Sequence, residues 1–298
     1  MKLVYSPQYE VDVGRHVFNT SKYRLVIERL RASGAFAESD ILDPEPASDD
    51  DIRLVHTAEY VAKLKTATLS PDELAQLEIG FSPALARAAW LWAGGSILAG
   101  RLAVHEGACF HDGGGWHHAF PDHGEGFCVI NDHAVAVRKL IADGVIGSAI
   151  IVDCDVHQAN GTAAIFAHDP NVMTFSIHQE SIYPDVKPPS DLDVGLADET
   201  GDEVYLARLE ANLIKALDGW RPELMFYVAG ADTFESDQLG GLNLTIDGMK
   251  QRDQVVCHAA RHNGIPVAAV LAGGYASRVD DVATIHANTA IVMKDMLG

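Results

Sequence analysis

The chain has 298 residues and 48% of them are apolar, so it can bury a sizeable core and has the composition of neither a disordered nor a fibrous protein. Its 22 basic and 42 acidic residues give a net charge of −20. This charge disfavours direct binding to nucleic-acid phosphates; it would attract cationic substrates, and it serves solubility equally well.

The four cysteines form no C-x-x-C pair, and each lies in or beside an apolar run, so we expect reduced, mostly buried thiols. The N-terminus has no apolar core or cleavage pattern typical of a signal peptide. No apolar stretch reaches membrane-spanning length. These features predict a cytoplasmic protein without a membrane partner, and they leave its oligomeric state open.

Short apolar runs alternate with helix-like stretches along the chain. In chain order the pattern predicts a strand at Leu3–Tyr5, helices at Ala84–Val104 and Ala134–Ala142, strands at Ala149–Val152 and Val172–Ile177, a helix at Glu203–Leu217, a strand at Leu224–Ala229, a helix at Gly248–His262 and a strand at Val267–Leu271. Asp43–Asp51 and Asp185–Asp202 are rich in Pro, Asp and Ser and are expected to be surface loops. With no repeat or linker, the alternation predicts a single α/β domain, 1–298, with a parallel sheet covered by helices on both faces.

Polar side chains follow the predicted strands at the points where the strands end. Because ligands of open α/β sheets bind beyond the carboxyl ends of the strands, one crevice could gather these groups. Asp153, Asp155 and His157 follow the strand predicted at Ala149–Val152, and His178 follows the one at Val172–Ile177. Asp232 follows the strand at Leu224–Ala229, and Gly273-Gly274-Tyr275 follows the one at Val267–Leu271.

The segment from Asp153 to His157 is the strongest local indication of a metal site. Asp153, Asp155 and His157 alternate along an extended segment, so they share one side of it. Carboxylate and imidazole ligands suit zinc, and also iron, manganese or cobalt. One of the three groups can orient a ligand instead of binding the metal, and Asp232, after two small residues, would then be the third ligand. Two carboxylates and one imidazole leave the fourth position open. The alternative is that these acids cap the helices that follow them.

His117 and His118 follow a glycine-rich loop, where histidines are seldom core residues. They suit a general base and a general acid beside a bound metal, and the alternative is a surface pair. Tyr275 could stabilise an oxyanion, and Phe127 and Tyr183 could wall an apolar slot, although ordinary packing is the better explanation of each aromatic taken alone. The chain lacks a G-x-S-x-G elbow, a phosphate-binding G-x-x-x-x-G-K-[ST] loop and an H-E-x-x-H helix.

Taken together, these motifs resemble the histone deacetylase family of the arginase–deacetylase fold. The order Gly-Gly-x-His-His, Gly-Phe-Cys, Asp-x-Asp-x-His, Gly-Ala-Asp, Gly-Gly-Tyr is that of the family and spans nearly the whole chain. The stretches His16–Arg24, His157–Gly161 and Ser190–Leu196 resemble more narrowly the small class IV proteins of bacteria. The resemblance implies a three-layer fold whose mostly parallel sheet has about eight strands.

The resemblance also implies a role for each matching residue. The zinc ligands would be Asp155, His157 and Asp232, with iron(II) as an alternative metal, and a potassium ion would be surrounded by Asp153, Asp155, His157, Ser176 and Ile177. The tandem histidines would be His117, oriented by Asp153, and His118, the main proton shuttle, paired with Asn160. Tyr275 would stabilise the transition state, and the substrate tunnel would be lined by Gly126, Phe127, Tyr183 and Leu239.

The implied reaction is hydrolysis of an acyl-lysine amide, in a peptide or protein, by a water that the metal activates. The alternatives are a hydrolase of small acylated amines such as acetylpolyamines, a non-catalytic acyl-lysine binding module, and a binuclear ureohydrolase, which would need more carboxylates. Two departures from the family stand out. Asn160 replaces the aspartate of many members and should leave His118 more acidic, and Gln158-Ala159 replaces the commoner Gln-Gly.

Overall fold

The computed structural model describes residues 1–298 and contains one sheet of eight strands. The strands are β1 (Lys2–Val4), β2 (Ile41–Leu42), β3 (Ala108–His111), β4 (Ala149–Asp153), β5 (Val172–Gln179), β6 (Leu192–Leu196), β7 (Leu224–Val228) and β8 (Val267–Val270). The helices are α1 (Ser21–Ser33), α2 (Asp49–Ile52), α3 (Ala58–Thr66), α4 (Pro71–Leu77), α5 (Pro83–Glu106), α6 (Asp132–Ala142), α7 (Asn160–Phe166), α8 (Asp202–Leu217), α9 (Ile246–Asn263) and α10 (Val279–Leu297).

All neighbouring strands are parallel, and their order is β2-β1-β3-β8-β7-β4-β5-β6. From β4 the chain moves to β5 on one side, whereas from β7 it moves to β8 on the other side. The connections therefore diverge between β4 and β7, which creates a crevice at the carboxyl ends of these two strands.

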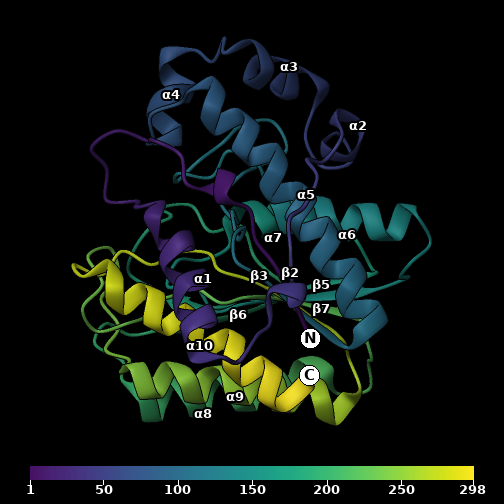
Figure 1. Ribbon diagram of the computed structural model, residues 1–298, viewed down its shortest axis with the longest axis vertical. Helices are drawn as coiled ribbons and strands as arrows, with labels where there is room; N and C mark the ends of the chain where they lie inside the picture. The colour runs from purple at the N-terminus through teal and green to yellow at the C-terminus, as the bar shows by residue number, and fades with distance from the viewer.

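Helices cover both faces of the sheet (Figure 1). Helices α1, α8, α9 and α10 pack together on one face, and α5 and α6 pack on the other. Helix α5 begins where Ser82 caps the amide of Leu85 and Pro83 occupies the first turn, and Gly107 caps its C-terminal end. Its many alanines and glycines allow it to lie close to the strands. No helix has the length and apolar character needed to cross a membrane.

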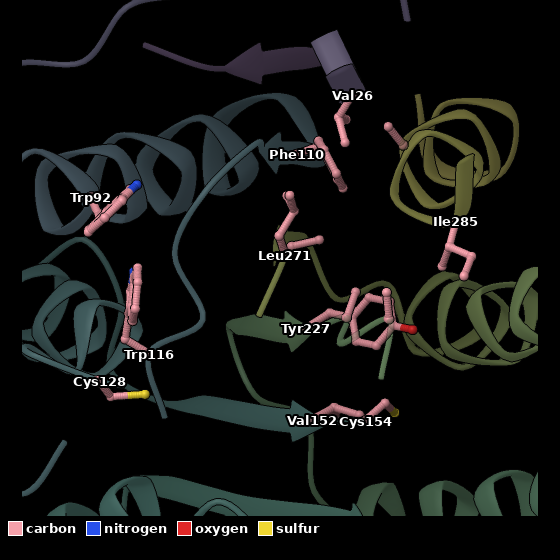
Figure 2. Packing of buried hydrophobic residues seen from close by; sticks show 14 of the residues in the cluster. Val26, Trp92, Phe110, Trp116, Cys128, Val152, Cys154, Tyr227, Leu271 and Ile285 are labelled. Carbon is pink, nitrogen blue, oxygen red and sulfur yellow. The ribbon is translucent and has the colours of Figure 1, made fainter. Parts of the chain in front are cut away.

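The core is divided between the two faces of the sheet. Along β4, Ile150 and Val152 belong to the larger core cluster and Ala149 and Ile151 to the smaller one, because successive side chains of a strand point to opposite faces. Figure 2 shows part of the larger cluster, including Val152 and Tyr227 of neighbouring strands. The rings of Trp92 and Trp116 also pack there, with centroids 4.5 Å apart, so the segment before His117 rests on a rigid support.

The structure confirms the predicted parallel α/β sheet with helices on both faces, and the predicted elements agree with it to within two residues at each end. All four cysteines are free and buried, as expected. The expectation that Asp185–Asp202 is only a loop is wrong, because the edge strand β6 lies within it and pairs with β5. Likewise, Asp43–Asp51 includes the start of α2, where Ser48 and Asp51 form a capping box.

Candidate active site

The side chains of Asp155, His157 and Asp232 converge in the crevice between β4 and β7. Their candidate ligand atoms all lie within 4.8 Å of one another, and all three residues are buried. The Nδ1 atom of His157 lies 3.0 Å from Oδ1 of Asp155 and 3.4 Å from Oδ2 of Asp232. Two acidic oxygens and one imidazole nitrogen thus surround a single point, as the sequence predicted, and this donor set suits a divalent cation.

The electrostatics of this cluster indicate a missing positive charge. Oδ2 of Asp232 is buried and accepts no hydrogen bond. Because a carboxylate oxygen can only accept, this atom needs a donor or a cation beside it. Burial and the neighbouring charge of Asp155 raise the pKa of Asp232 to about 7. Burial also disfavours the charged form of Asp155, but His117 and His157 outweigh it and hold the pKa of Asp155 well below its usual range. A bound dication would satisfy the free oxygen and both carboxylates.

Backbone amides in the segments after β4 and β8 hold the two carboxylates in place. The amide of Val156 donates to Oδ1 of Asp232 (2.9 Å), and the amide of Gly273 donates to Oδ2 of Asp155 (2.9 Å). A Cβ atom at residue 273 would lie 2.0 Å from Oδ2 of Asp232, so only glycine fits there. The buried Arg252 donates to the carbonyl of Gly230 (2.5 Å) and so fixes the loop before Asp232.

The two adjacent histidines lie beside this cluster with their Nε2 atoms 3.1 Å apart. Nδ1 of His117 contacts Oδ2 of Asp153 at 2.8 Å, and Nδ1 of His118 contacts Oδ1 of Asn160 at 2.6 Å. Each imidazole therefore has an oxygen partner at Nδ1 and directs Nε2 towards the site. This is the arrangement expected of a pair of residues that transfer protons.

The pKa values of the two imidazoles are shifted in opposite directions. Burial lowers the pKa of His117, but the charges of Asp153 and Asp155 outweigh burial and raise this pKa to about 9. Burial, followed by the charges of His117 and His157, lowers the pKa of His118 well below its usual value. Burial is the main cause of this acidity, and the bond to Asn160 acts in the opposite direction.

An outer cavity of about 450 Å³ leads to this cluster. All four residues predicted to form a tunnel line it, namely Gly126, Phe127, Tyr183 and Leu239, and His118, His157 and Tyr275 line it as well. A Cβ atom at residue 126 would lie 2.8 Å from Cδ2 of His118, and φ is +51° there, so glycine brings the wall close to the histidine. A smaller cavity of about 20 Å³ lies at the histidine pair and is also lined by Trp116.

The residues predicted to surround a potassium ion also lie close together. Asp153 of β4 pairs in register with Ser176 of β5, and Oδ1 of Asp153 accepts from the amide of Asp155 at 3.0 Å. Ile177 follows Ser176 on β5, and both residues are buried. The hydroxyl of Ser176 also has a partner on the protein, Nδ1 of His178 at 2.9 Å.

Two acidic residues that sequence reasoning did not single out support the site. Oδ1 of Asp132 accepts from the amides of Gly115 (3.0 Å) and Trp116 (2.9 Å), which shapes the loop before the histidines. Glu125 accepts from Nδ2 of Asn160 at 2.6 Å. Only its position between two glycines, two residues before Phe127 of the tunnel wall, marks Glu125 in the sequence.

Comparisons with known proteins agree with this geometry. A family model described as "Histone deacetylase domain" matches residues 16–290. The chain is 37% identical to an uncharacterised protein of Picosynechococcus over 95% of each chain, and 31% identical to "Histone deacetylase 2" of Arabidopsis thaliana over 92% of this chain and 74% of that protein. The crystal structure of the HDA15 HD domain has the same fold, with a TM-score of 0.81 at 24% identity, and the match covers 100% of this chain and 91% of that one. The chain belongs to the histone deacetylase family.

Proposed function

We propose that this protein is a zinc-dependent deacylase that hydrolyses the amide of an acylated lysine side chain and releases a carboxylate and a free amine. The observation that carries the proposal is the convergence of Asp155, His157 and Asp232 beside the paired imidazoles of His117 and His118, at the inner end of one cavity. The unpartnered oxygen of Asp232 supports a bound cation at this point. Iron(II) would suit the same ligands.

The metal, when bound, supplies a Lewis acid that activates water and polarises the acyl carbonyl. The residues of the chain move the protons and hold the charge. His118, held by Asn160 and neutral, accepts a proton from the attacking water at Nε2 and then delivers it to the leaving amine, while His117, held by Asp153, stays protonated beside it. The hydroxyl of Tyr275, whose pKa is raised by burial and by Asp155 and Asp232, stays protonated and donates to the developing oxyanion.

The wall of the outer cavity suits the chain of the substrate. Phe127 and Tyr275 meet edge to face with ring centroids 5.9 Å apart, and Tyr183 lies edge-on to His118 at 5.0 Å. These aromatic surfaces and Leu239 give an apolar passage for an extended aliphatic chain. In the same proposal, the cluster of Asp153, Asp155, Ser176 and the carbonyls of His157 and Ile177 would hold a potassium ion.

A second candidate function, hydrolysis of small acylated amines, is favoured by Glu78 at the rim of the cavity. Glu78 lines the outer cavity and is exposed, and its side chain makes no hydrogen bond or ion pair. Its backbone is held by His16, whose Nε2 contacts the Glu78 carbonyl at 3.0 Å. A free carboxylate on a rim of a chain with a net charge of −20 would attract the distal ammonium of a polyamine.

The test is hydrolysis of a panel of acyl-lysine peptides and acetylpolyamines with apo protein, with the zinc- or iron-loaded protein, and after addition of a chelator. The expected result is hydrolysis that requires metal at a stoichiometry of about one ion per chain and is lost in Asp232→Ala. Glu78→Gln would lower kcat/KM for acetylpolyamines alone if small amines are the substrates. Hydrolysis that persists in chelator, or a metal-loaded protein inactive on every substrate, would contradict the proposal.

A further inference from the structure

A chain of hydrogen bonds runs outward from His118 to the tunnel wall. Nδ1 of His118 contacts Oδ1 of Asn160 at 2.6 Å, and Nδ2 of Asn160 donates to Oε1 of Glu125 at 2.6 Å. The hydroxyl of Tyr183 donates to the same oxygen at 2.7 Å, and Nε2 of Gln76 donates to the other oxygen at 3.1 Å. Glu125 thus connects the partner of a site histidine with a residue that lines the cavity.

The chemistry of these groups determines the direction of every bond. An ionised carboxylate only accepts, so Asn160 must turn its NH₂ group towards Glu125 and its oxygen towards His118. The amide of Gly161 also donates to this oxygen, at 2.9 Å. An amide oxygen only accepts, so the proton of neutral His118 must lie on Nδ1, which leaves Nε2 free to face His117.

Glu125 is well suited to this part because it remains anionic. Burial opposes its ionisation, but hydrogen bonds from His123, Tyr183, Gln76 and Asn160 outweigh burial and lower its pKa to about 2. The neutral Asn160 therefore has a full negative charge next to it, one residue further from His118 than in family members with an aspartate at this position.

We propose that Glu125 and Asn160 form a matched pair in which Glu125 is a positioning residue: it holds the Asn160 amide in the one orientation that fixes the proton of His118 on Nδ1. The inference rests on the proposed deacylase function for its catalytic consequence. The pairing predicts that the residue that functions at position 160 depends on the residue at position 125. An aspartate at 160 would place two carboxylates at hydrogen-bond distance, where both cannot ionise without repulsion.

A double-mutant cycle tests this dependence. Asn160→Asp should lower kcat/KM by about 10-fold or more, although it supplies the charged partner found in other family members. Glu125→Gln should stay within about 3-fold of wild type, because its amide oxygen still accepts from Asn160. The double variant should recover to within about 3-fold of wild type, since the introduced glutamine can turn its NH₂ group towards the introduced aspartate.

The melting temperature of the metal-free protein gives a second readout that needs no activity. Asn160→Asp should lower it by about 2 °C or more, and addition of Glu125→Gln should restore it. Glu125→Ala should lower kcat by about 10-fold, because Asn160 then loses the acceptor that orients it. Gln76→Ala, which removes only the outermost bond to Glu125, is the matched control and should change kcat by less than about 2-fold.

The outcomes separate the inference from the function on which it rests. Recovery of both kcat/KM and melting temperature in the double variant supports the pair. A double variant no better than Asn160→Asp, or a fully active Glu125→Ala, overturns it. An inactive metal-loaded wild type refutes the deacylase function instead, and the melting temperatures then still decide whether residues 125 and 160 are matched.

Discussion

Replacing Tyr275 by Phe removes one hydroxyl from the wall of the outer cavity and leaves the ring in place. The position of the ring does not depend on this hydroxyl, which makes no hydrogen bond in the structure. The backbone is held on both sides, because the Tyr275 amide donates to Oδ2 of Asp237 (2.7 Å) and its carbonyl accepts from Nε2 of Gln238 (2.6 Å). The ring packs against Phe127 and Phe18, with centroids 5.9 and 6.5 Å away.

The expected loss is therefore catalytic rather than structural. Deletion of one donor to an oxyanion typically costs about 100-fold in kcat, which corresponds to about 2.7 kcal/mol of transition-state stabilisation. Since the ring contacts persist, the free energy of unfolding of Tyr275→Phe should stay within about 1 kcal/mol of the wild-type value. Metal content should not change, because the hydroxyl is not among the converging ligand atoms.

The assay measures kcat and KM for an acetyl-lysine peptide, metal content by atomic absorption and stability by urea unfolding, all on the same preparation. Tyr275→Leu, which also removes the ring, is the comparison and should additionally raise KM. Full activity of Tyr275→Phe with one bound metal would refute the oxyanion role. A loss of activity accompanied by a loss of metal would show that the tyrosine supports the cation site instead.

Three further predictions concern metal binding and the stability of the fold. Gly273→Ala should abolish metal binding in isothermal titration, because the added methyl carbon would lie 2.0 Å from Oδ2 of Asp232 and 2.6 Å from Oδ2 of Asp155; retention of wild-type affinity would contradict this packing. Excess zinc at about 100 times its Kd should stabilise the fold by about 2.7 kcal/mol, measured by urea unfolding, and Asp232→Ala should remove this effect. Burial lowers the pKa of His56 to about 4, below its unfolded value of about 6.5. Between pH 4 and about 6.5 the unfolded chain therefore binds more protons than the folded one, so the free energy of unfolding should fall as the pH falls through this range. His56 alone accounts for about 2 kcal/mol at pH 5, and His56→Gln should make unfolding less dependent on pH over this range.

The repeating pattern of the chain determined much of the fold. Short apolar runs such as Ala149–Val152 favour strands covered on both faces because of their length and β-branched content, and the parallel sheet follows from the helices between them. The short edge strands were beyond reach. Leu192–Leu196 lies in a polar segment, and its pairing with β5 supplies hydrogen bonds that local propensity does not reveal.

The sequence by itself also determined which side chains meet, since Asp155, His157 and Asp232 all follow strands whose carboxyl ends share one edge of the sheet. Only the tertiary structure decided what surrounds them. Glu125 reaches Asn160 across 35 positions of sequence, and Gly273 lies against both carboxylates, because loops from separate strands close over the crevice. Periodicity records which face of an element is buried, but a hydrogen bond between two loops depends on distances that exist only after the chain has folded.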